Sequence, residues 1–234
     1  MGVHNADLQL YMAGSIERIY GQVRLRETAR EFHGAAVKRF HEHYASEYPD
    51  RETADAPDVL MATLEYEGGA IGQWICDLAA QGPGLHQFSV VGSNGQVDLP
   101  GVRSGRPLRV HVGTEPDPLG DDDVLAMVPA FHLDDRTSRF FGGDRLARYD
   151  DDGSGVGGEA DRKLIAIEMA ELLDAIETGG EIEVDAETGL TAVGLVMAVH
   201  ESSHAGRALA MSEILDGSLS GYQREADRAL GLCG

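Results

Sequence analysis

Residues 59–112 repeat one pattern: short segments with apolar residues at every second position, separated by turn residues. This period of two is typical of a β-strand with one buried face. Consecutive strands joined by short turns form a mainly antiparallel sheet, and Asn94-Gly95 between two such segments is a strong hairpin signal. The positions expected on one face of successive strands are Leu60, Ala62, Leu64 and Tyr66; Ala70, Gly72, Trp74, Cys76 and Leu78; His86, Phe88 and Val90; and Leu108, Val110 and Val112.

Helical patterns lie at both ends of this region, and a further alternating segment covers residues 19–26. Near the C-terminus, Ile165, Met169, Leu172 and Ile176 recur at helical spacing before Gly179-Gly180, and Asp185 begins a second helix. Its expected buried positions are Leu190, Val193 and Met197, and continuing at 100° per residue adds His200 and His204 to that face. Residues 207–215 are expected to form a closing strand, and residues 222–230 a last short helix.

These elements predict an α+β fold: a large, mainly antiparallel open sheet of roughly six or more strands, with helices packed on one face. We expect a single domain over residues 1–234. Residues 28–57 form a polar excursion from it, and residues 116–158 an acidic, glycine-rich loop region. We found no internal repeat, and no Gly-x-Gly-x-x-Gly turn after a strand.

The first fourteen residues predict a helix with a polar residue pair at its start. Asn5 is the expected N-cap, Leu8, Tyr11 and Met12 form the expected apolar stripe, and Gly14 ends the helix. His4 then lies just outside the capped end, and Asp7 lies in the first turn, where the helix dipole favours negative charge. A histidine at such a position can donate or accept a proton near neutral pH.

The composition restricts the possible partners. The net charge is −21, from 40 acidic and 19 basic residues, which argues against nucleic acid and anionic membrane surfaces as partners. Lysine occurs only at positions 38 and 163, as expected either for a protein fitted to a salt-rich cytoplasm or for a gene of high GC content. The two cysteines form no pattern. Neither a signal peptide nor a membrane-spanning segment is evident, and we expect a soluble, cytoplasmic protein.

Three motifs resemble metal sites. His200-Glu201-Ser202-Ser203-His204 has the H-E-x-x-H spacing of zinc proteases, but no third histidine follows, and the alternative is a pair of partly buried helix histidines. His33, His41 and His43 lie in the polar excursion, where surface histidines are the simpler interpretation. Residues 150–161 imitate a calcium loop, with Gly157 where an apolar residue is usual and Asp161 in place of the last glutamate. We expect no bound metal.

Five segments together resemble the C-terminal domain of the Gfo/Idh/MocA family of oxidoreductases. They are G-V-H-N-A-D-L at 2–8, V-V-G-S-N-G at 90–95, E-M-A-E-L-L-D-A-I-E-T-G at 168–179, V-D-A-E-T-G-L at 184–190 and H-E-S-S-H-A-G-R at 200–207. The last is similar to the E-S-x-x-x-G-R ending of the family's last long helix. It would thus account for the zinc-like spacing through ordinary helix residues.

The resemblance implies the substrate side of a two-domain enzyme that moves a hydride between NAD or NADP and a sugar or polyol carbon. His4 matches the catalytic histidine of the family's D-x-x-x-H pattern, and we expect Asp7 and His86 to contact substrate. The aspartate of that pattern would fall one place before Met1, and neither the Rossmann domain nor the lysine of the family's E-K-P segment is found in this sequence. We therefore expect a truncated or split gene product that is inactive alone and does not bind the cofactor by itself.

The alternative is a non-catalytic binding or assembly module, so whether this chain is an enzyme stays open. In the family the open sheet face commonly packs against another subunit, and Ala70, Gly72 and Trp74 would suit such a face here. The expected partners are a second copy of the chain, a separately encoded Rossmann-domain chain and a small sugar or polyol. A zinc hydrolase is the most distant alternative.

The charge imbalance predicts a salt-dependent stability. At ~0.01 M salt the Debye length is about 30 Å, so charges across a whole face repel, whereas at 1 M it is about 3 Å. We expect the melting temperature to rise between low salt and about 1 M KCl by more than the roughly 2–4 °C that corresponds to ~1 kcal/mol. NaCl should act nearly as well. A flat melting temperature across this range would leave only the genomic explanation for the composition.

Overall fold

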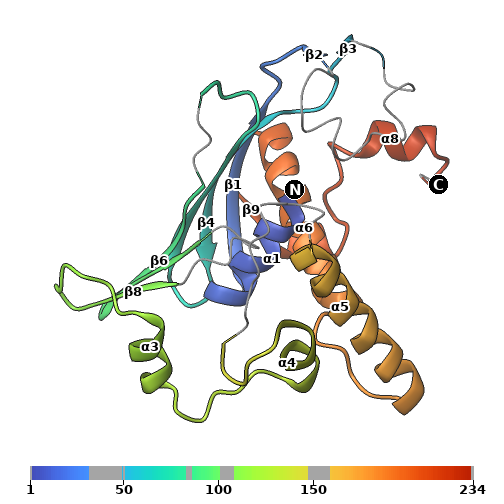
Figure 1. Ribbon diagram of the computed structural model, residues 1–234. Coiled ribbons are helices and arrows are strands. Elements are labelled where there is room, and N and C mark those ends of the chain that lie inside the picture. Colours follow the sequence, from blue (N-terminus) through green and yellow to red (C-terminus); the bar gives the residue numbers. More distant parts are fainter. Residues whose placement is uncertain are drawn as a thin grey trace. The chain divides into compact units, whose positions relative to one another are not determined.

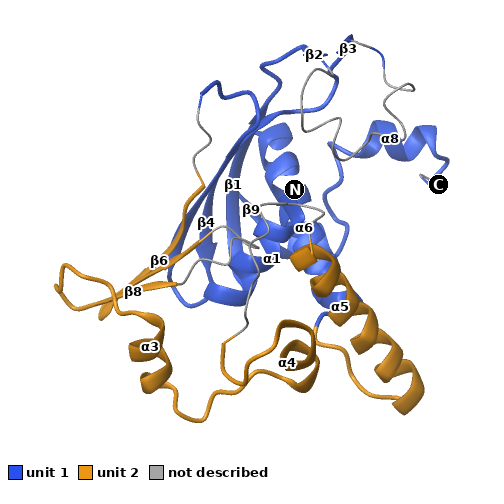
Figure 2. Ribbon diagram, in the orientation of Figure 1, with its two compact units in different colours: residues 1–82, 184–234 blue, residues 83–183 orange. Residues whose placement is uncertain are grey.

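The computed structural model describes residues 2–31, 49, 51–82, 86–100, 108–146 and 159–232. The chain divides into two compact units, shown in Figure 2. Unit 1 comprises Met1–Gly82 and Val184–Gly234, and unit 2 comprises Pro83–Glu183. The expectation of one domain over residues 1–234 stays a prediction.

Unit 1 is built on a four-stranded antiparallel sheet with the order β5-β4-β1-β9. The strands are β1 (Ile16–Arg24), β4 (Val59–Tyr66), β5 (Ile71–Asp77) and the short β9 (Leu209–Ala210). The predicted alternation is confirmed, since Ala62, Leu64, Tyr66 and Trp74 are all buried on one face. Helices α1 (Gly2–Ala13) and α6 (Ala186–Ala205) lie against that face (Figure 1). The opposite face of the sheet is exposed.

Helix α6 lies unusually close to strand β1. A Cβ atom added at Gly21 would lie 2.6 Å from a side-chain carbon of Val199 and 2.7 Å from its backbone oxygen. At this distance the hydroxyls of Ser202 and Ser203 accept hydrogen bonds from the backbone N–H groups of Gly21 and Val23, at 2.9 and 3.0 Å. Buried backbone N–H groups need such partners. Strand β9 pairs with β1 only at Arg18 and Ile19, and at Gly21 and Val23 the two serine hydroxyls take the place of a neighbouring strand.

The polar excursion begins and ends in a two-stranded pair, β2 (Ala29–Glu31) with β3 (Arg51–Thr53). The connection from β1 to β2 is held by the buried Asp58, whose carboxylate accepts from the N–H groups of Arg26 and Glu27 and pairs with Arg30 at 3.0 Å. Burial alone would raise the pKa of Asp58, but these bonds outweigh it and hold that pKa below its usual range.

The C-terminal segment corrects one prediction. In place of a strand over residues 207–215, only Leu209–Ala210 pairs with β1, and α7 (Ser212–Leu215) follows at once. The reason is Glu213, whose carboxylate accepts from the N–H of Ala210 at 2.9 Å and pairs with Arg207 at 2.6 Å, closing a turn. The Arg207 guanidinium lowers the pKa of Glu213 to about 2. The expected last helix is confirmed as α8 (Arg224–Ala229).

Unit 2 contains the predicted hairpin and the first of the two long helices. Strands β6 (Phe88–Gly92), β7 (Gly95–Leu99) and β8 (Arg109–Val112) form an antiparallel sheet, and α5 spans Glu159–Thr178. The part of the acidic region that the structure describes is not only loop. It contains α3 (Asp121–Met127) and α4 (Asp135–Phe141), and the carboxylate of Asp134 caps α4 by accepting from the N–H groups of Arg136 and Thr137.

The fold class is confirmed, but the largest described sheet has four strands, fewer than expected. Strand β5 ends at Asp77, whose carboxylate accepts from the N–H of Ala79, and β6 begins only at Phe88. The buried faces of two helices also differ from the prediction. Helix α1 buries Ala6 and Gln9 and leaves Tyr11 78% exposed. Helix α6 buries the residues Ala192, Gly194, Leu195, Ala198, Val199, Glu201 and Ser202.

The contact between β1 and α6 predicts that glycine 21 cannot be replaced. In Gly21→Ala the added methyl group would force Val199 or its backbone to move, and overpacking of this kind typically costs about 1–3 kcal/mol. Gly189→Ala is the matched control, because a Cβ atom at Gly189 in α6 would have no neighbour within 4 Å and alanine favours the helix. In urea unfolding monitored by circular dichroism, we expect the first variant alone to lose stability. Equal midpoints for both variants would contradict this prediction.

Candidate functional site

The candidate site is the N-terminal end of α1, and the packing of α1 determines how that end is presented. Ala6 is fully buried in the core that α1 shares with α6, and Leu10 packs against the same core. Gly2 lies close to α6, where an added Cβ would lie 3.5 Å from a methyl carbon of Val196. The first turn of α1 is therefore held against α6.

His4 is exposed in this first turn. It is two residues before the buried Ala6, about 200° away around the helix, and so faces away from the core. Asp7 is partly exposed and lies one turn further on, at i+3 from His4, where two side chains are neighbours on a helix surface. The structure thus brings these two predicted site residues to one side of α1.

The start of α1 differs from the prediction. The helix already includes Gly2, so Asn5 lies inside it and is not the N-cap. The Asn5 backbone oxygen instead accepts from the side-chain amide of the buried Gln9, at 3.2 Å. His86, the third predicted site residue, belongs to unit 2, where it is exposed just before β6. The roles assigned to His4, Asp7 and His86 stay predictions.

The H-E-x-x-H motif has a structural role in unit 1. Glu201 is 1% exposed, and its carboxylate oxygens accept from the backbone N–H of Tyr222, each at 3.0 Å. The imidazole of His200 stacks on the Tyr222 ring with 4.8 Å between centroids. A Cβ atom at Gly221 would lie 3.0 Å from the His204 ring. The motif thus holds the segment before α8 against α6, and the carboxylate that a zinc protease would use as a base is engaged.

Within the described ranges, no group of three or more His, Cys, Asp or Glu side chains is placed to hold a metal ion. His33, His41 and His43 lie outside the described residues, as does the start of the calcium-like segment. Its last position, Asp161, is buried in the first turn of α5.

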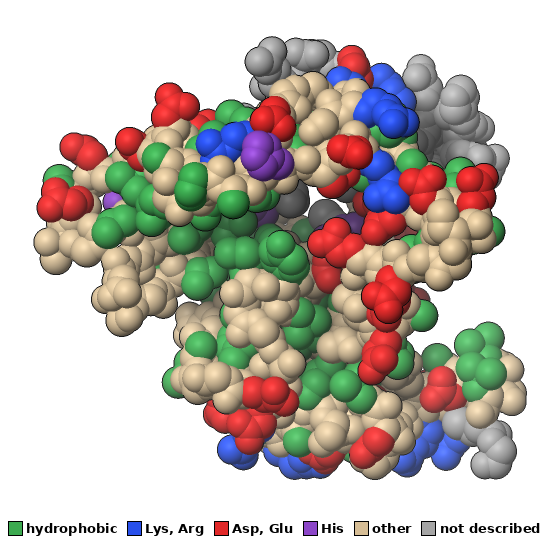
Figure 3. Space-filling model, turned by 90° about the horizontal axis from the view of Figure 1, so that it is seen from below, with side chains coloured by type: hydrophobic (Ala, Val, Ile, Leu, Met, Phe, Trp, Pro, Cys, Tyr) green, Lys and Arg blue, Asp and Glu red, His purple; other side chains and the backbone are tan. Residues whose placement is uncertain are grey.

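The described residues do not fit the pyrophosphate of a dinucleotide. Such a group binds best at a helix N-terminus approached by a glycine-rich turn after a strand. Here the Gly92–Gly95 turn leads into β7, and each described helix from α3 to α8 carries an acidic residue in its first turn. Acidic side chains are also widespread on the surface in Figure 3. Of the described helices, only α1 has no acidic residue in its first turn.

Comparison with known proteins assigns this fold. The architecture is that of an α+β domain with antiparallel strands and helices on one face of the main sheet. Residues 1–98 match the family described as the GFO/IDH/MocA C-terminal domain, which confirms the predicted resemblance over this part of the chain. None of the curated proteins compared with the chain is similar to it.

Solved structures of oxidoreductases share the fold. Levoglucosan dehydrogenase, in complex with NADH and L-sorbose, is 16% identical over 92% of this chain and 50% of its own, with a TM-score of 0.61. An oxidoreductase from Agrobacterium radiobacter, in complex with NAD+, L-tartaric acid and magnesium, is 15% identical over 92% and 48%, with a TM-score of 0.56. An NAD-binding oxidoreductase from Klebsiella pneumoniae is 17% identical over 90% and 49%, with a TM-score of 0.59. The chain spans about half the length of these proteins.

Of the helices in the described part of the chain, none is both long and apolar enough to span a membrane.

The stacked His200 predicts a loss of stability on mild acidification. Burial lowers the pKa of His200, outweighing the opposite effect of Glu201. The unfolded chain therefore binds this proton more readily than the folded chain. The stabilising contribution is complete above the unfolded pKa of about 6.5 and is lost as the pH falls through the folded pKa.

We expect the melting temperature to fall between about pH 7 and pH 5, and to fall less in His200→Phe, which keeps a ring on Tyr222. The matched control is His132→Phe, since His132 is an exposed histidine of unit 2 that pairs with the exposed Asp144. Equal pH dependence in wild type and His200→Phe would contradict the assignment. Carboxylates with lowered pKa values, such as Glu213, lose their stabilising contribution only at more acidic pH, so they do not account for a change between pH 7 and pH 5.

Proposed function

We propose that this chain supplies the substrate side of an NAD(P)-dependent oxidoreductase that acts on a sugar or polyol hydroxyl. The observation that carries the proposal is the exposed His4 with the partly exposed Asp7 one turn further on in α1, both within the residues that match the GFO/IDH/MocA C-terminal domain. The names of similar structures support a dinucleotide and, for levoglucosan dehydrogenase, a sugar substrate. The cofactor is held by a Rossmann domain outside these residues.

The chemistry of the pair follows from its position. Oxidation of a secondary alcohol removes a hydride from carbon and a proton from the hydroxyl. A neutral imidazole can take that proton near pH 7, and within the described structure the His4 imidazole makes no hydrogen bond or ion pair. The Asp7 carboxylate, one turn away, accepts a hydrogen bond from a neighbouring hydroxyl and so orients the substrate.

The proposal predicts that the chain alone does not bind the cofactor. The acidic first turns of α3–α8 repel a pyrophosphate, and the Gly92–Gly95 turn precedes a strand rather than a helix. Titration calorimetry with NAD, NADH, NADP and NADPH should give no dissociation constant tighter than about 1 mM. Tighter binding would contradict the assignment of the cofactor site to another domain.

The catalytic role is tested in the assembled enzyme. The coding sequence directly upstream, in frame or as a neighbouring gene, should encode a Rossmann segment ending in G-G-x-x-x-D. With that segment present, His4→Ala should lower kcat/KM by a factor on the order of 10²–10⁴, while His132→Ala, an exposed histidine of unit 2, should leave it unchanged. If no Rossmann-bearing partner exists, or if His4→Ala retains full activity, the enzymatic proposal fails.

An assembly function is the second candidate, and the exposed face of the main sheet favours it. We call the residues Tyr20, Gln22, Met61, Thr63, Gln73 and Ile75 the open sheet face; they line a shallow groove of about 200 Å³. Cross-strand pairing places them in two rows across β1, β4 and β5. Met61 and Ile75 are 49% and 63% exposed.

The open sheet face replaces the one predicted from sequence. Trp74 is buried in the core, and Gly72 shares its side of β5, so neither can contact another subunit there. The neighbouring positions along β5 face outward instead. None of the six residues is charged, although 40 acidic and 19 basic residues are spread over the chain. A second copy is the partner this favours, because two chains of charge −21 repel least where both surfaces are neutral.

A single charge on this face should therefore dissociate the assembly. We expect the wild-type chain to sediment as an oligomer in high salt and Ile75→Asp to sediment as a monomer, because a buried unpaired carboxylate is costly. Ile176→Asp is the matched control, since Ile176 in α5 is similarly exposed, at 70%. A wild-type chain that stays monomeric at high concentration in 1 M KCl would exclude the open sheet face as an interface for a second copy.

A further inference from the structure

Trp74 is the single tryptophan of the chain. It is 5% exposed although it lies in β5, at one end of the strand order of the unit 1 sheet. Its side chain belongs to the core that the sheet shares with α1 and α6. Small neighbours make room for the indole ring, because the cross-strand partner of Trp74 is Ala62 and Gly72, two residues earlier on the same face, has no side chain. The ring can therefore extend from β5 to the helices.

The atom of Trp74 that reaches α1 is Cη2, at the far end of the indole ring. A Cβ atom added at Gly2 would lie 3.8 Å from this atom, and 3.5 and 3.6 Å from the two methyl carbons of Val196 in α6. These are ordinary packing distances, so the first residue of α1 lies against both the indole ring and α6. A strand and a helix that are far apart in the sequence thus meet at the start of α1.

This contact matters for His4 because helix ends fray, and the first four N–H groups of a helix have no partner within it. Packing holds the start of α1 at Gly2 and at the fully buried Ala6, which are four residues apart and share one face of the helix. His4 lies midway between them in sequence, about 200° around the helix from each, and is exposed. The direction of its imidazole therefore depends on both inward contacts.

A phenylalanine at position 74 would separate this contact from the rest of the core packing. The phenyl ring is shorter than indole and would end before the position of Cη2, so the contact with Gly2 would be lost. The indole nitrogen Nε1 is buried and has no hydrogen-bond partner in the described structure. An unpaired buried N–H group is costly, and phenylalanine would remove that cost. The larger ring therefore needs a reason beyond the stability of the sheet, and its contact with the start of α1 supplies one.

We propose that Trp74 is a positioning residue for His4. Its indole ring holds the first turn of α1 and so fixes the direction of the His4 side chain. This inference rests on the proposed function, in which the His4 imidazole accepts the proton of the substrate hydroxyl. Trp74 is buried and is assigned no contact with the substrate, because it acts through the backbone of α1.

The contact is tested first in the chain alone, by amide hydrogen exchange measured with NMR. In a regular helix the Ala6 N–H bonds to the carbonyl of Gly2, so its protection reports on the first turn. In Trp74→Phe we expect this amide to exchange about tenfold faster, the factor that corresponds to about 1.4 kcal/mol, while the amides in the middle of α6 change less. Ile19→Val, which shortens a fully buried side chain of β1, is the matched control and should leave the Ala6 amide unchanged.

Two results of this experiment would overturn the proposal. They are an unchanged Ala6 amide in Trp74→Phe and an equal change in α1 and α6, since either would show that the ring serves the core as a whole. If the variant does not fold, the wild-type chain decides. The indole Hη2 proton should then show a nuclear Overhauser contact with the α protons of Gly2, and the absence of this contact would also overturn the proposal.

A double-mutant cycle in the enzyme assembled with its Rossmann segment distinguishes positioning from stability. Trp74→Phe should lower kcat about tenfold with little change in KM, and should have no further effect in the His4→Ala background. An equal loss in both backgrounds would show that Trp74 acts independently of His4 and would overturn the proposal. Failure of the proposed function gives a different result, because His4→Ala would then retain full activity whatever the exchange of the Ala6 amide shows.

Discussion

The hydroxyl of Ser202 is the contact on which the rest of unit 1 depends. It accepts from the N–H of Gly21 in β1 at 2.9 Å and donates to the backbone oxygen of Arg207 at 2.6 Å. One buried side chain thus satisfies a strand and the turn that ends α6. Leaving such buried groups without a partner costs about 1–3 kcal/mol each. The contact is possible only because residue 21 has no side chain to separate the strand from the helix.

The position of the candidate site follows from this contact through a short series of packed elements. Because α6 is fixed on β1, it can share one core with α1, in which Leu195 and Ala198 of α6 and Ala6 of α1 are buried. With Ala6 facing inward, helix geometry directs His4 outward. The same helix uses Glu201, next to Ser202, to hold Tyr222. The sequence H-E-S-S-H therefore resembles a catalytic motif although its residues have structural roles. Ser202 bonds to a strand and to the turn after α6, and Glu201 holds the C-terminal segment.

The sequence predicted where the elements lie better than which way the helices face. Strand alternation identified the buried side of β4 correctly because apolar and polar residues differ clearly there. In α6, by contrast, the larger residues Leu190 and Val193 are exposed, and much of the buried face consists of Ala, Gly and Ser. Close backbone approach favours small residues, so a method that looks for large apolar stripes selects the wrong side. In α1, Tyr11 misled in the same way.

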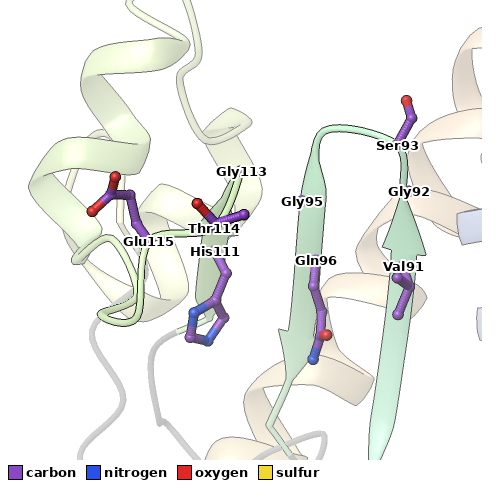
Figure 4. Close-up of a pocket in the computed structure, with 9 residues that line it drawn as sticks. All are labelled: Val91, Gly92, Ser93, Gly95, Gln96, His111, Gly113, Thr114 and Glu115. Carbon is purple, nitrogen blue, oxygen red and sulfur yellow. The ribbon is translucent and has the colours of Figure 1, made fainter.

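Site prediction reached His4 through family resemblance. The residues around the β6–β7 turn gave no sequence signal beyond a hairpin, because Gln96 and His111 are brought together by strand register and not by spacing along the chain (Figure 4). Charge at helix ends is a signal that sequence reasoning applied only to Asp7. An acidic residue in the first turn stabilises a helix through its dipole, and each described helix except α1 has one. In α1 the sequence prediction placed Asp7 in that first turn, but the helix already includes Gly2, so Asp7 lies one turn further on and the dipole argument does not apply to it.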